Sequence, residues 1–82
     1  DIYWIVVSDD LRGQGLGKLL MAETEKLIAL NGGRQVYAET SSREQYKPTQ
    51  AFYEACGFHQ EAFLKNFYHE GDSKIIYAKV LK

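Results

Sequence analysis

Several features that would mark a particular class of protein are scarce in this sequence of 82 residues. The single cysteine, Cys56, has no partner for an internal disulfide, which is typical of a protein from the reducing cytoplasm. No apolar run approaches the roughly 20 residues needed to cross a membrane, and no signal peptide is recognisable. A net charge of −1 argues against general binding to nucleic acids or anionic membranes. We therefore expect a small cytoplasmic domain without nucleic-acid or membrane partners.

The first half of the chain predicts two strands separated by a helix. β-branched and aromatic side chains predict strands at residues 2–7 and 35–40. A helix is expected from about Gly15 to Leu30, ended by Asn31-Gly32-Gly33. An apolar stripe along this helix contains four leucines: Leu16, Leu20, Leu27 and Leu30. A strand, a helix and a strand in this order predict a βαβ unit with parallel strands and a right-handed crossover.

The second half predicts a short helix followed by a hairpin. Pro48 fits the first turn of a helix that ends before Gly57. Strands are expected at residues 58–67 and 73–81, with His69-Glu70-Gly71-Asp72 as the turn of an antiparallel hairpin. The whole chain, residues 1–82, is thus expected to form one α/β (α+β) domain in the order β-α-β-α-β-β.

Three glycines, Gly13, Gly15 and Gly17, stand where the first strand leads into the helix. Because glycine in a helix costs roughly 1 kcal/mol relative to alanine, their presence needs a reason. A helix N-terminus offers unpaired N–H groups that favour an anion, and glycines let phosphate oxygens approach those groups. Arg12 and Lys18 flank the turn and add positive charge. The pattern predicts a phosphate-bearing ligand; the alternative is a tight turn whose glycines serve only the backbone.

Two common phosphate-binding motifs do not fit this turn. A P-loop requires glycine at the position of Arg12, and Ser or Thr at the position of Leu19. A dinucleotide-binding fingerprint that starts at Gly13 requires glycine or alanine at the position of Lys18. Both motifs are therefore excluded.

A different family does match. Arg12-Gly13-Gln14-Gly15-Leu16-Gly17 resembles the Arg/Gln-x-x-Gly-x-Gly/Ala signature of the GNAT superfamily of N-acetyltransferases. Residues 49–58, TQAFYEACGF, resemble the helix of that family that ends in Phe-Tyr-x-x-x-Gly-Phe. The resemblance covers the C-terminal part of the domain, and the N-terminal strands and helices have no counterpart here. It implies a partial GNAT-like acyl-CoA N-acyltransferase fold, with a parallel pair splayed at the cofactor site and a C-terminal antiparallel hairpin.

The resemblance also implies an activity and its residues. The family transfers an acetyl group from acetyl-CoA to a primary amine, here of a small molecule or a peptide, by direct attack in a ternary complex. The glycine loop binds the pyrophosphate, and the main chain of the preceding strand binds the pantetheine arm. Tyr46 stands where an asparagine commonly contacts the cofactor. Carried over, the cofactor-binding positions are Ile5, Val6, Val7, Arg12, Gly13, Gln14, Gly15, Leu16, Gly17, Lys18 and Tyr46.

Tyr53 aligns with the tyrosine that often protonates the departing thiolate of coenzyme A. A tyrosine is protonated at neutral pH, so it can donate to sulfur; the alternative is an aromatic core residue. The general base is open among Asp1, Glu39 and an ordered water. His59 and His69 lack the spacing of a metal site, and we expect no metal.

Two functions without catalysis are alternatives. One is a coenzyme-A-binding module derived from a truncated acetyltransferase. The other is an interaction module in which the open edge of the first strand forms a homodimer or exchanges strands.

Overall fold

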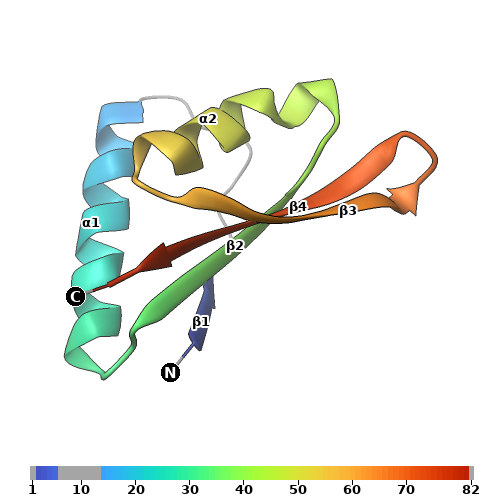
Figure 1. Cartoon of the computed structure of the whole chain (residues 1–82). Coiled ribbons are helices and arrows are strands. Elements are labelled where there is room, and N and C mark those ends of the chain that lie inside the picture. The colour runs from blue at the N-terminus through green and yellow to red at the C-terminus, as the bar shows by residue number, and fades with distance from the viewer. Residues whose placement is uncertain (1, 6–13, 82) are drawn as a thin grey trace.

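The computed structural model describes residues 2–5 and 14–81, which form a four-stranded sheet with two helices (Figure 1). The elements are β1 (Ile2–Ile5), α1 (Gln14–Leu30), β2 (Gln35–Ser41), the short 3₁₀ helix η1 (Glu44–Tyr46), α2 (Lys47–Ala55), β3 (His59–His69) and β4 (Asp72–Val80). This order confirms the predicted β-α-β-α-β-β arrangement. Val6 and Val7, expected to continue the first strand, lie outside the described residues.

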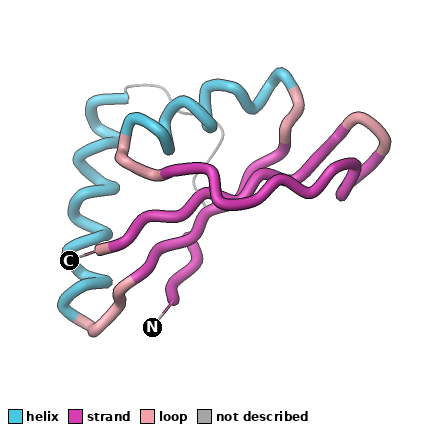
Figure 2. Tube along the Cα trace, in the orientation of Figure 1, coloured by secondary structure: helices cyan, strands magenta, loops and turns pink. Residues whose placement is uncertain are grey.

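The sheet has the strand order β1-β2-β4-β3. β1 and β2 are parallel, whereas β2 with β4 and β3 with β4 are antiparallel (Figure 2). The last described pair of the parallel ladder is Ile5 with Ala38, while β2 continues to Ser41 against β4. The βαβ unit and the C-terminal hairpin are thus confirmed. The splay expected in the parallel pair is not seen between residues 2–5 and β2, and the residues that follow Ile5 lie outside the described part of the chain.

Glycines end α1 and close the hairpin. The N–H of Gly33 donates to the carbonyl of Ile28 at 2.9 Å, and Gly32 adopts a φ of +84°. These contacts satisfy the last carbonyls of the helix in the way a left-handed glycine cap does. A Cβ at Gly33 would lie only 2.3 Å from Cγ2 of Ile28, so only glycine fits there. In the hairpin, Gly71 has a φ of +79° between the paired residues His69 and Asp72.

The hydrophobic core lies between one face of the sheet and the two helices. Met21 and Ile28 come from α1, and Phe52 and Tyr53 come from α2. β2 and β4 contribute Val36, Ala38, Ile75 and Tyr77, and Phe58 lies immediately before β3. Tyr3 and Ile5 of β1 pack against this core as half-buried side chains. None of the described helices is long and apolar enough to cross a bilayer.

The leucine stripe of α1 is not the face that packs on the sheet. Its four leucines are between 58% and 82% exposed, whereas Met21 and Ile28 are buried. The buried face of a helix depends on where strand side chains lie beneath it, and periodicity alone does not specify this. The apolar residues 2–5 predict a strand covered on both faces. In β1 as described this prediction is wrong, because Ile2 and Trp4 are exposed.

Candidate functional site

The two described glycines at the start of α1 have different surroundings. A Cβ built on Gly17 would lie 3.0 Å from Cε1 of Phe52, so Gly17 allows α2 to pack closely against α1. A Cβ built on Gly15 would meet nothing within 4 Å. No packing of the described residues therefore requires glycine at position 15, and none of these residues blocks the approach of a ligand at that point of the helix.

The α2 helix carries Tyr53 on its buried face. Its side chain is 1% exposed, and its ring centroid lies 5.6 Å from that of Phe58 and 5.5 Å from that of Tyr77. Rings at such distances in tilted arrangements stabilise one another beyond simple burial. Tyr53 is therefore an aromatic core residue, and the same packing holds its ring in one place.

Tyr77 of β4 is held by a hydrogen bond to Glu54, the residue that follows Tyr53 in α2. Its hydroxyl donates a hydrogen bond to Oε2 of Glu54 at 3.1 Å. Burial, together with this hydrogen bond to a carboxylate, raises the pKa of Tyr77 to about 12. Tyr77 thus stays protonated at neutral pH and links β4 to α2.

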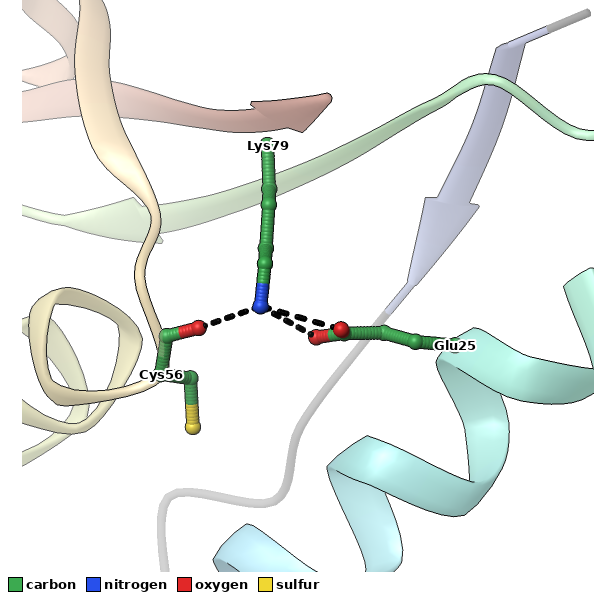
Figure 3. Close-up of polar contacts among 3 residues, drawn as sticks. All are labelled: Glu25, Cys56 and Lys79. Carbon is green, nitrogen blue, oxygen red and sulfur yellow. Dashed lines mark hydrogen bonds and ion pairs between the residues drawn. The ribbon is translucent and has the colours of Figure 1, made fainter. Parts of the chain in front are cut away.

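A second polar link joins three elements at one ammonium group (Figure 3). Lys79 of β4 places Nζ 2.9 Å from Oε1 and 3.2 Å from Oε2 of Glu25 in α1. The same Nζ donates to the carbonyl of Cys56, immediately after α2, at 2.7 Å. The side chains of Lys79 and Glu25 are only 27% and 15% exposed. This ion pair is mostly withdrawn from water, so it is screened less than a surface pair.

The pKa of the Cys56 thiol depends on the charged side chains around it. Burial raises its pKa first, and Glu25 raises it further, while Lys79 and Lys18 oppose the shift. A thiol with a raised pKa is a weak nucleophile at neutral pH. Cys56 packs against the core, as expected for a small hydrophobic side chain. The exposed Lys18 adds positive charge near the N-terminal part of α1.

Glu39 lies on the other face of the sheet from Tyr53. It follows Ala38, a core residue beneath the helices, and successive strand residues point to opposite faces. Oε2 of Glu39 is 2.7 Å from Nζ of Lys74, which also lies 4.5 Å from the centre of the Phe67 ring. The hydrogen bond to Glu39 raises the pKa of Lys74. Asp1, the other side-chain candidate for a base, lies outside the described residues.

Comparisons with known proteins decide the family. Residues 1–60 match the family described as acetyltransferase (GNAT) domain. The chain belongs to the GNAT acetyltransferase family. Among curated proteins, none matches the sequence significantly.

Solved structures share the GNAT fold with this chain. A Desulfovibrio desulfuricans protein, assigned as an acetyltransferase of the GNAT family, is 49% identical with a TM-score of 0.82, over 95% of this chain and 50% of that one. An aminoglycoside 6'-N-acetyltransferase complexed with coenzyme A is 23% identical with a TM-score of 0.72, over 90% and 54%. The ribosomal-protein-S18-alanine N-acetyltransferase from Escherichia coli is 24% identical with a TM-score of 0.71, over 89% and 48%. The chain thus spans about half the length of these structures.

The GNAT motif residues are only partly brought together. Gly17 of the glycine motif contacts α2, and Ile5 packs against the core that contains Tyr53. In contrast, α2 runs from η1 toward α1, so Tyr46 in η1 lies at the end of α2 that is far from α1 (Figure 1). Leu16 and Lys18 are exposed in the first turns of α1. Four expected cofactor contacts lie outside the described residues: Val6, Val7, Arg12 and Gly13. Of Gln14, the structure places only the backbone, as the first residue of α1.

The sequence motifs give no indication of the polar links Tyr77 to Glu54 and Lys79 to Glu25. A signal for one of them is present in the sequence. Lys79 shares the buried face of its strand with Tyr77, and Glu25 lies between Met21 and Ile28 at helical spacing. Charged side chains on two buried faces require partners, so each predicts an ion pair. Which residue pairs with which follows only from the tertiary structure.

Proposed function

We propose that this chain carries the acetyl-CoA-binding part of an N-acetyltransferase that transfers an acetyl group to a primary amine. The observation that carries the proposal is the open backbone at Gly15 in the first turn of α1. Glycine is unfavourable in a helix, and here no contact of the described residues accounts for it. A ligand that approaches the N–H groups of that turn accounts for it, and a pyrophosphate suits the positive end of a helix.

The proposed contacts follow the GNAT motif. Main-chain N–H groups of residues 12–18 hold the pyrophosphate, and the side chains of Arg12 and Lys18 add positive charge. The main chain of Ile5, Val6 and Val7 holds the pantetheine arm, and Tyr46 is a further contact. The coenzyme A bound to the related aminoglycoside acetyltransferase supports a ligand of this class.

The residues of this chain would act in the following order. Bound acetyl-CoA supplies a thioester whose carbonyl carbon an amine attacks directly. Main-chain N–H groups near Val6 and Val7 stabilise the charge on the carbonyl oxygen. As the new C–N bond forms and the C–S bond breaks, Tyr53 donates its proton to the leaving sulfur, and the amine loses a proton to the base. Tyr53 suits this role because core packing fixes its ring.

The acceptor is proposed to be a primary amine of a small molecule or a peptide. Two structural neighbours act on such groups, one on an aminoglycoside and one on the alanine of a ribosomal protein. Glu39 is a poorer candidate for the base, because it lies on the other face of the sheet from Tyr53 and its Oε2 already pairs with Nζ of Lys74. An ordered water is the alternative.

The first test is calorimetric titration of the chain with acetyl-CoA. We expect micromolar binding that is lost in Gly15→Glu, because a carboxylate then occupies the place of the pyrophosphate. Ala22→Glu adds the same charge at an exposed position farther along α1, so it is the matched control and is expected to bind normally. A folded wild-type chain that does not bind, or equal binding by Gly15→Glu, would refute the proposed site.

A second measurement separates transfer from binding alone. Amine-dependent release of free thiol from acetyl-CoA is the signature of acetyl transfer. Binding without release, across a panel of small amines and peptides, would favour the coenzyme-A-binding module.

A further inference from the structure

We propose that Lys79 is a positioning residue that sets the place of Tyr53 relative to the cosubstrate-binding turn of α1. The inference rests on the proposed function, because it assigns Lys79 a role in the same site. Lys79 touches neither the reacting atoms nor the proposed ligand contacts. It acts through Glu25 on α1 and through the carbonyl of Cys56 on α2.

The first argument is the scarcity of other polar links to α1. Its buried side chains, Met21 and Ile28, are apolar and hold the helix without directional contacts. The other hydrogen bond and ion pair of its described side chains, Thr24 to the carbonyl of Leu20 and Lys26 to Glu23, stay within the helix. Among the described side chains of α1, those of residues 15–30, Glu25 makes the one polar contact to another element, to Lys79. It therefore specifies how α1 is placed along and around its axis.

The second argument concerns the helix that carries Tyr53. The carbonyl of Cys56 belongs to the last turn of α2, where backbone oxygens lack helical partners. An ammonium at that point satisfies the carbonyl and suits the negative end of the helix. Gly57 follows with a φ of +93°, and a Cβ there would lie 3.3 Å from Nζ of Lys79. The chain thus leaves room for Lys79 at this end of α2 (Figure 3).

The two helices consequently meet at two fixed points. One is the close contact of Gly17 with Phe52, near the start of α1. The other is the Lys79 ammonium, two turns farther along α1 at Glu25. Tyr53 is next to Phe52 in the chain and three residues before Cys56, so both points bear on its position. Without the second point, only the apolar packing of Met21 and Ile28 opposes a rotation of α1 about the first.

This geometry predicts which ligands respond to loss of Lys79. Acetyl-CoA spans both helices, so its affinity depends on their relative placement. The nucleotide half alone, adenosine 3′-phosphate 5′-diphosphate, contacts only the turn of α1. In Lys79→Met we expect acetyl-CoA to bind about tenfold more weakly, and the nucleotide half to change less than about twofold. Glu25→Gln removes the negative charge from the contact to α1 and keeps the contact to Cys56. It is expected to change the ratio of the two affinities in the same direction.

The controls are the matched substitutions Lys26→Met and Glu23→Gln. Lys26 and Glu23 form an exposed ion pair within α1, so these variants change the charge in the same way without a tertiary contact. They are expected to keep the wild-type ratio of the two affinities. Calorimetry at a temperature where every variant is folded, verified by its melting curve, gives both affinities. If Lys79→Met does not fold, Glu25→Gln alone provides the test.

The outcomes are distinct. A selective loss of acetyl-CoA affinity supports the positioning role. Equal loss for both ligands, or no loss together with a lower melting temperature, shows a merely structural ion pair and overturns it. Failure of the folded wild type to bind acetyl-CoA overturns the proposed function, and the positioning role falls with it.

Discussion

The hydroxyl of Tyr77 lies 3.1 Å from Oε2 of Glu54 and donates a hydrogen bond to it. The bond joins β4 to α2, the helix that carries Tyr53. It keeps the Tyr77 ring against the Tyr53 ring. Removal of the hydroxyl in Tyr77→Phe is expected to lower the free energy of unfolding by about 1 kcal/mol. Urea denaturation measures the change, and Tyr37→Phe is the control, because its hydroxyl makes no hydrogen bond among residues 2–5 and 14–81. Equal effects of the two substitutions would contradict the prediction.

The burial of Tyr77, together with this hydrogen bond, predicts a loss of stability at alkaline pH. The pKa of Tyr77 rises from 10.0 to about 12 on folding, so between these values the folded chain holds a proton that the unfolded chain has released. Stability from this group is complete below pH 10 and falls as the pH rises toward 12, by on the order of 2 kcal/mol. Denaturation curves at several pH values measure the slope. Tyr77→Phe should remove this part of the slope, and an unchanged slope in the variant would refute the assignment.

Substitution by alanine is expected to affect the stability of the fold differently at Gly15 and at Gly17. Gly15→Ala is expected to stabilise the fold by about 0.5 kcal/mol, because the added methyl group meets no atom and the helix gains propensity. The same methyl group is expected to weaken acetyl-CoA binding. Gly17→Ala is the comparison: its Cβ would lie 3.0 Å from the Phe52 ring, so it should gain less stability than Gly15→Ala or lose some. Thermal unfolding and calorimetry on the two variants measure both quantities.

The pKa of the Cys56 thiol depends on the charges of Lys79 and Glu25. Because Lys79 lowers the pKa of this thiol, Lys79→Met is expected to raise it further. Because Glu25 raises it, Glu25→Gln is expected to lower it. The pH dependence of alkylation by iodoacetamide measures the pKa in each variant, with Lys26→Met as the control on the same helix. Shifts of the same sign in both variants would mean that altered burial, rather than charge, dominates.

Tyr53→Phe tests the proposed acid. It removes the proton donor and keeps the ring that packs on Phe58 and Tyr77, so binding of acetyl-CoA should be retained. The rate of amine-dependent thiol release is expected to fall by about 100-fold or more. Steady-state assays at saturating acetyl-CoA give this rate. An unchanged rate would leave Tyr53 with its role in the core alone.

Local chemistry made much of the fold predictable. Gly32 and Gly71 mark the end of α1 and the hairpin turn because their positive φ angles suit a residue without Cβ. Pro48 marks the first turn of α2 because its fixed φ fits a helix start. The short connections from β1 to α1 to β2 impose a parallel pair. For the candidate site, the motif predicted the glycines at the start of α1 as ligand contacts. At Gly15 no described residue lies near the position of a Cβ, which agrees with that prediction.

The order of the elements, their approximate ends and the two motifs follow from the amino-acid sequence, because these depend on neighbours along the chain. Tertiary structure alone decided that Met21 and Ile28, not the leucines, face the sheet, since that depends on which strands lie beneath α1. It also decided that Glu25, Cys56 and Lys79 meet. Their separations along the chain, 31 and 23 residues, carry no local signal. A buried charge predicts that a partner exists, but packing chooses the partner.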